Sequence, residues 1–265
     1  MRGIAHDTIV EMFDRKTIYI FLVVTAITIL IILASGSMEF SFNAEIRGDM
    51  DLGDMNEMFG NPIMRMYSSF LTFLVLLAVM ATAGLLPGML VKGRADYFLS
   101  KPISRASLLF YKAASMWLVY GAVIVVCGVV CYLLQWLVHG MFEAGFIVLI
   151  LMNLVSLFIW MSITIFAGIA FGSTGMVIMS AFVVFILQWL LSWHEQIAGF
   201  IGSGIVEKII TGLYYIVPKT GEVSDLSLKL AVGGRIESLM PLYSSLAFAV
   251  LLYIVTIWLF RRKNY

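Results

Sequence analysis

Long apolar stretches dominate the hydropathy pattern of this 265-residue chain. Six of them contain no Asp, Glu, Lys or Arg over 18 residues or more, a length at which an α-helix crosses the hydrocarbon core of a bilayer, about 30 Å thick. Barrel strands need only about 10 residues and alternate polar with apolar positions, a pattern that these stretches lack. We therefore predict six transmembrane helices, over residues 17–35, 67–91, 113–138, 144–171, 176–193 and 242–260.

The polar leader before the first stretch, residues 1–16, predicts a short interfacial helix. Its apolar positions and its acids recur at helical spacing, which is typical of an amphipathic helix lying on the inner membrane surface. The apolar face would comprise Ile4, Thr8, Ile9 and Met12, set against Asp7, Glu11 and Asp14.

The segment between the fifth and sixth stretches, residues 194–241, is too long and too apolar for a plain loop. The apolar stripe Ile205, Ile209, Leu213 and Ile216 has helical spacing, but Glu207 and Lys208 argue against a span. We predict an extracytoplasmic interfacial or re-entrant helix that ends at Pro218. The whole chain is thus expected to be all-α, a polytopic membrane protein with a single transmembrane domain over residues 1–265.

Composition supports lipid as the main solvent. Hydrophobic residues make up 62% of the chain and charged residues only 12%, which leaves too little polar surface for a soluble domain of this length. A secretory signal ending near Ala34 is the alternative for the first stretch. Against it, the apolar run is longer than a signal core and its leader mixes acids with bases.

The distribution of basic residues predicts the orientation. Eleven Lys and Arg residues fall on the side of the termini and six on the opposite side, and the side richer in basic residues is usually cytoplasmic. We therefore expect a multi-pass protein of the plasma (inner) membrane with both termini in the cytoplasm. The inner set is Arg2, Arg15, Lys16, Lys92, Arg94, Lys101, Arg105, Lys112, Arg261, Arg262 and Lys263.

Several classes of function are disfavoured by what the chain lacks. No Gly-x-x-x-x-Gly-Lys-Ser/Thr loop occurs, so we expect no nucleotide cradle in this chain, no cofactor and no enzymatic activity of its own. Ion-coupled carriers usually place ionisable side chains within the bilayer, and the six predicted spans contain no Asp, Glu, His or Arg. We also expect no catalytic residues, no metal site and no nucleic-acid partner.

A few polar residues lie at predicted membrane depth. Asn153 and Gln188 are candidates for a substrate path, with interhelical hydrogen bonding as the alternative for them and for Gln135. Cys127 and Cys131 lie one helical turn apart and are expected to serve as packing residues.

Six methionines lie in or beside the first outer connection. Thioethers are soft ligands that suit Cu(I), so copper handling is one interpretation of this cluster. Apolar packing of a loop helix is the other, since methionine is frequent throughout the chain. The six are Met38, Met50, Met55, Met58, Met64 and Met66.

The cytoplasmic connection over residues 92–112 carries the most specific motif. Residues 92–105 read Lys-Gly-Arg-Ala-Asp-Tyr-Phe-Leu-Ser-Lys-Pro-Ile-Ser-Arg, and Lys112 follows. This run resembles the corresponding loop of type-2 ABC transporter permeases, as do the leader, the six spans, the long outer segment and the basic tail. Two departures are Leu90-Val91-Lys92 in place of the family's acids and Tyr111 in place of its glycine.

The resemblance implies the membrane subunit of an ABC exporter, which drives export or transmits force outward with ATP that a separate subunit hydrolyses. Such subunits pair as homodimers or heterodimers and bind two ATP-binding cassette subunits through a coupling helix. For this loop, the resemblance implies that the ATPase partner is contacted by Tyr97, Phe98, Leu99, Lys101, Pro102 and Arg105. Anchoring of the helix at the inner lipid surface is an equal alternative for Lys101 and Arg105, and it is the expectation for Lys112. Two alternatives stay open: a permease that helps to mature a copper site, and a membrane scaffold or sensor without an ATPase.

Overall fold

The computed structural model describes residues 2–14, 16–45, 62–90, 104–139, 144–193, 212–234, 236 and 238–262. In these ranges, helices are the only regular secondary structure. Six of the helices in these ranges are long and apolar enough to cross a membrane. The predicted class is confirmed to this extent: the described chain is all-helical and has six helices that could cross a membrane.

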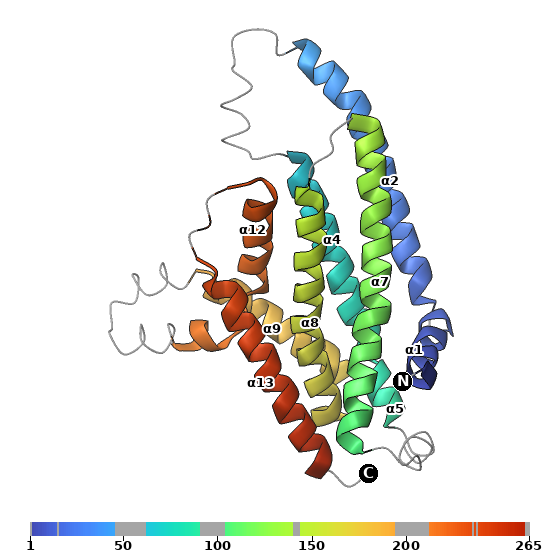
Figure 1. The fold of residues 1–265 in the computed structure, drawn as a ribbon, viewed down its shortest axis with the longest axis vertical. Coiled ribbons are helices and arrows are strands. Elements are labelled where there is room, and N and C mark those ends of the chain that lie inside the picture. The colour runs from blue at the N-terminus through green and yellow to red at the C-terminus, as the bar shows by residue number, and fades with distance from the viewer. Residues whose placement is uncertain are drawn as a thin grey trace.

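The helices are arranged around α8 (Gly145–Phe171) (Figure 1). Most of its length is buried, and its most extensive contacts are with five helices. They are α4 (Pro62–Thr82), α7 (Arg105–His139), α9 (Thr174–Leu191), α12 (Thr220–Ala231) and α13 (Met240–Arg262). The remaining helices, α1 (Arg2–Asp14) and α2 (Thr17–Glu45), pack along α7, and α5 (Leu85–Met89) follows α4.

Helices at the periphery expose large apolar side chains. Only 17% of the apolar window of α9 and of α13 is buried, and 22% of that of α2. Such faces would be a liability in water but match hydrocarbon, which needs no polar covering. The burial pattern therefore suits a helical bundle surrounded by lipid.

The third span is longer than the hydropathy pattern predicts. Helix α7 begins at Arg105, whereas the apolar stretch begins at Ala113. Ser104 supplies the N-cap: its Oγ accepts a hydrogen bond from the Ser107 N–H at 3.1 Å. Lys112 consequently lies within the helix, two turns from its start.

The second span bends instead of ending at Pro87 and Gly88, as the sequence predicts. Helix α4 stops at Thr82, Ala83 and Gly84 form a turn, and α5 then carries both Pro87 and Gly88. Pro87 has no N–H to donate to the carbonyl of Ala83, which interrupts the helical ladder there.

The segment before the last span contains a helix that the sequence reasoning missed. Residues 212–216 are helical and end before Pro218, but α12 follows directly and runs back into the bundle. It packs on α8, α4, α13 and α9, and its end approaches the start of α8, where Ala231 lies against Gly145. Ile205 and Ile209 of the predicted stripe lie outside the described residues.

Helix α1 and the C-terminal end of α13 lie at the same end of the bundle (Figure 1). The opposite end holds the starts of α4 and α8.

The short turn between α8 and α9 is made by Gly172, whose φ of 64° is left-handed and whose N–H donates to the Gly168 carbonyl at 3.0 Å.

We predict that the end with the termini faces the cytoplasm. In a background with Cys127 and Cys131 replaced by Ala, cysteines at Asp14 and Arg262 should react with an impermeant maleimide from the cytoplasmic side only. Cysteines at Ala144 and Val232, both exposed at the opposite end, should react from the outside only. Labelling of all four from one side would contradict the six-span topology.

Candidate functional site

The residues predicted to contact an ATPase lie mostly outside the described ranges. This holds for Tyr97, Phe98, Leu99, Lys101 and Pro102. Arg105 is described: it is half-buried in the first turn of α7. Its position makes the predicted loop continuous with the longest helix of the bundle.

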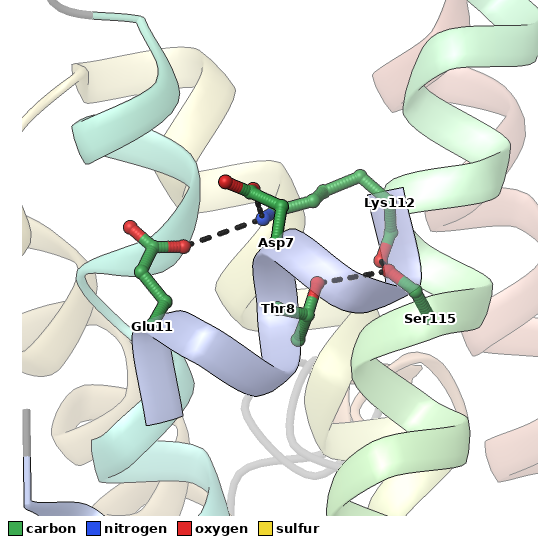
Figure 2. A network of polar contacts seen from close by, with 5 residues as sticks. All are labelled: Asp7, Thr8, Glu11, Lys112 and Ser115. Atoms are coloured by element: carbon green, nitrogen blue, oxygen red, sulfur yellow. Dashed lines mark hydrogen bonds and ion pairs between the residues drawn. The ribbon is translucent and has the colours of Figure 1, made fainter. Parts of the chain in front are cut away.

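Lys112 forms a buried ion-pair network with the leader helix (Figure 2). Its side chain is 1% exposed, and its Nζ donates to Asp7 Oδ2 at 2.9 Å and to Glu11 Oε2 at 3.3 Å. The expectation that Lys112 anchors the helix at the lipid surface is therefore wrong. The early start of α7 places this side chain within the bundle, where two carboxylates compensate its charge.

The leader helix presents its acids to α7. Glu11 is buried together with Thr8, whose Oγ1 lies 3.1 Å from Ser115 Oγ, whereas Phe13 is 52% exposed. Of the predicted apolar face, Thr8 and Met12 are buried but Ile9 points outward. The prediction that apolar and acidic residues occupy opposite faces is therefore wrong: Lys112 holds Asp7 and Glu11 on the inner side, whereas Ile9 and Phe13 are exposed together with Asp14.

This network joins α1 to α7 at Lys112, the last residue of the predicted coupling loop, which lies two turns from the start of α7. Removing one member of a buried ion pair typically costs about 3–5 kcal/mol, because the other charge is left without a partner. The side chain of Asp7 is 28% exposed, so its ion pair contributes less to this cost than that of Glu11. The ion pairs of Lys112 with Asp7 and Glu11 thus hold the leader helix firmly against α7.

The two predicted path residues line one cavity. Asn153 of α8 and Gln188 of α9 both border a cavity of about 310 Å³, which α4, α12 and the residues before α12 close on the other sides. The sequence alone did not indicate that these residues meet. The aromatic side chains at this cavity are Trp160, Phe185, Trp189 and Tyr214.

The hydrogen bonds of these two residues differ. Asn153 Nδ2 donates to the carbonyl of Leu149 in its own helix at 2.9 Å. Gln188 Oε1 accepts a hydrogen bond from the hydroxyl of Thr220, which joins α9 to α12. The interhelical hydrogen bond given as the alternative for Gln188 is therefore present. Gln188 Nε2 is buried and has no acceptor among the described residues. Gln135, the third candidate, lies on α7 and does not border this cavity.

Charged side chains that the sequence reasoning placed at the outer surface also border the cavity. They are Lys219, Glu222 and Asp225, from the start of α12. Lys219 is 5% exposed, and its Nζ lies 3.2 Å from Ser244 Oγ and 4.4 Å from the centre of the Tyr214 ring. The spans themselves lack such charges here, but the segment before the last span brings them against α8 and α4.

Each of these charges has a distinct environment. Burial lowers the pKa of the Lys219 ammonium, and the nearby Glu222 carboxylate opposes this by raising it. Tyr214 donates its hydroxyl to Glu222 Oε2 at 2.9 Å. Partial desolvation raises the pKa of the Asp225 carboxyl group, against the lowering effect of Lys229 and Arg65.

A second hollow continues the first along α4 and α12. It has a volume of about 390 Å³, and Thr72, Ser224 and Asp225 border both hollows. Arg65 borders the second one only, near the start of α4. Thr72 Oγ1 and Ser224 Oγ lie 3.3 Å apart at their junction. Polar side chains thus line a route from mid-bundle to the end opposite the termini.

A signal for α12 is present in the sequence. Val223, Leu226 and Ser227, the buried residues of this helix, recur at helical spacing directly after Pro218, and Glu222 lies in the first turn. The helix has only 12 residues, fewer than a transmembrane helix needs, so the hydropathy pattern does not reveal it.

The described part of the chain holds no metal-binding cluster of His, Cys, Asp or Glu side chains. Cys127 and Cys131 are buried, unpaired thiols on α7, and no group of three His, Cys, Asp or Glu side chains could hold an ion there. Met64 is fully buried and Met66 packs against the core. The side chains of Met38, Met50, Met55 and Met58 lie outside the described residues.

Comparison with protein-family models and with curated proteins finds no match to this chain.

Proposed function

We propose that this chain is the membrane subunit of an ATP-binding cassette transporter, which moves a solute outward while a separate subunit hydrolyses ATP. The observation that carries the proposal is the cavity inside the helical bundle that is bordered by Asn153, Gln188 and Lys219. Polar and ionisable groups are costly at membrane depth and usually mark a solute pathway.

The need for a separate motor follows from the sequence. The chain contains no phosphate-binding loop, so we propose that it does not use ATP by itself. Its spans contain no acid or histidine that could couple an ion, and the acids at the cavity, Glu222 and Asp225, come from α12. The loop over residues 92–105, which resembles a coupling loop, offers a docking surface for such a motor. We further propose that two copies, or one copy and a related permease, form the membrane unit.

The packing supplies a path from that loop to the cavity. The loop leads directly into α7, and α7 is tied to α1 by Lys112 and packs on α8. Helix α8 carries Asn153 and Trp160, both of which border the cavity. A displacement of the loop on ATP binding would therefore move α1 and α7 as a unit against α8, which is the rigid-body type of switching.

Purification in mild detergent from native membranes tests this proposal. An ATP-binding protein should be recovered with the chain, and Phe98→Ala should weaken the complex at least about tenfold, since truncating a buried aromatic anchor typically costs about 2 kcal/mol. Phe110→Ala is a matched control, because Phe110 is 60% exposed on α7. Recovery of no ATP-binding protein would contradict the proposal. So would unchanged recovery and ATP turnover in both Phe98→Ala and a Lys101 and Arg105 double replacement.

A further inference from the structure

The start of α12 gathers hydrogen-bond donors at the cavity. Its first intrahelical bond runs from the Val223 N–H to the Lys219 carbonyl at 2.9 Å. The N–H groups of Thr220, Gly221 and Glu222 come before that bond and have no acceptor within the helix. All three residues border the cavity, and the start of a helix carries a partial positive charge that favours anions.

Lys219 adds a buried cation at the same place. Its ammonium group contacts the Ser244 hydroxyl and the face of Tyr214, and no described carboxylate forms an ion pair with it. Glu222, the nearest acid in sequence, accepts the Tyr214 hydroxyl instead. A buried ammonium with one polar contact is unusual, because buried charges are normally paired.

Gln188 provides an independent indication. Gln188 borders the same cavity, and its Oε1 is held by Thr220. Its Nε2 is buried and has no acceptor among the described residues. A buried amide donor without a partner costs about 1–3 kcal/mol, so an acceptor supplied by a bound molecule would remove that cost.

We propose that this cavity binds an amphiphilic solute through its anionic head group, a carboxylate or a phosphate, at the start of α12. Lys219 supplies the charge, the first N–H groups of α12 supply directed donors, and Gln188 supplies an amide donor. The apolar part of the solute lies against Trp160, Phe185 and Trp189, which border the same cavity. This inference deepens the proposed transport function, whose cavity it uses.

Gly221 allows the head group to approach the backbone. A Cβ built at this position would meet no atom within 4 Å, so the space beside it is open. A branched side chain there would fit the fold but would occupy the space in which the head group contacts the N–H groups.

Titration calorimetry on the purified chain in phosphatidylcholine nanodiscs, without any ATPase, tests the proposal. Octanoate or octyl phosphate should bind, and the tighter of the two identifies the head group. Octylamine and acetate should bind at least about tenfold more weakly, since one lacks the negative charge and the other the apolar part. Octylamine binding as tightly as both anions, or acetate binding as tightly as octanoate, would overturn the proposal.

Three variants locate the site. Lys219→Met should weaken binding of the preferred anion about ten- to a hundredfold, the usual value of a charged hydrogen bond. Arg261→Met is the control for loss of a positive charge: Arg261 is exposed in the last turn of α13, at the end of the bundle that holds the termini, and its replacement should leave the affinity unchanged. If Lys219→Met does not fold, Gly221→Val decides, and it should weaken binding at least about tenfold with an unchanged unfolding temperature.

Unchanged affinity in Lys219→Met, or in Gly221→Val, would overturn the assignment. No ATPase is present in this assay, so the two claims can fail separately. Anion binding without recovery of an ATP-binding partner would contradict the transport function but support the binding site. Recovery of the partner without anion binding would support the transport function but contradict the binding site.

Discussion

Replacing Lys112 with Met should lower the free energy of unfolding by about 3 kcal/mol, the lower end of the range for breaking a buried ion pair. The ammonium is 1% exposed and holds both Asp7 and Glu11, so its loss leaves two carboxylates facing an apolar helix surface. Unfolding by SDS in mixed micelles measures the change. Trypsin should also cut faster after Lys16, an exposed residue in the turn between α1 and α2, as α1 detaches.

The triple variant Asp7→Asn, Glu11→Gln and Lys112→Met separates charge from packing. It leaves no uncompensated charge, so most of the lost stability should return even though the ion pairs are gone. Lys229→Met should leave both readouts unchanged, because that lysine is exposed. A single Lys112→Met variant as stable as the original chain, or a triple variant no better than the single one, would show that the network does not hold α1.

The spans were predictable because hydropathy measures the free energy that decides their placement. Every predicted stretch overlaps one of the six helices that are long and apolar enough to cross a membrane. Helix ends follow other physics. The start of α7 depends on the Ser104 cap, and the bend between α4 and α5 on one missing N–H group at Pro87. Neither changes the hydropathy profile.

The candidate site was only partly predictable. Asn153 and Gln188 stood out as polar residues in apolar runs, and both border the cavity. Lys219 did not stand out, because a lysine in a connection is ordinarily solvated and only the docking of α12 buries it. Lys112 and Asp7 are 105 residues apart, and one sequence holds no information on which of several acids a basic residue meets.

The packing of α12 against the start of α8 predicts a large loss of stability when Gly145 is replaced. A Cβ at this first position of α8 would overlap the carbonyl group of Ala231 at the end of α12 and would lie 2.9 Å from Met64 Cε. The conflict with Ala231 involves backbone atoms, which cannot turn aside as a flexible side chain can. We expect Gly145→Ala to destabilise the protein by about 3 kcal/mol, the upper end of typical overpacking costs, and to lower the unfolding temperature in detergent.

Gly145→Ala should also weaken anion binding, because a displaced α12 carries Lys219 and Gly221 away from Gln188 on α9. Gly175→Ala is the matched control: it too lies in the first turn of a span, where the nearest atom to a Cβ is Ser173 Oγ at 3.9 Å. That variant should be unchanged or stabilised by up to about 1 kcal/mol, since Ala loses less backbone entropy in a helix than Gly. Equal stability of the two variants would mean that the end of α12 does not pack on the start of α8. Loss of stability with undiminished octanoate binding would mean that this packing does not position the start of α12 for the anion.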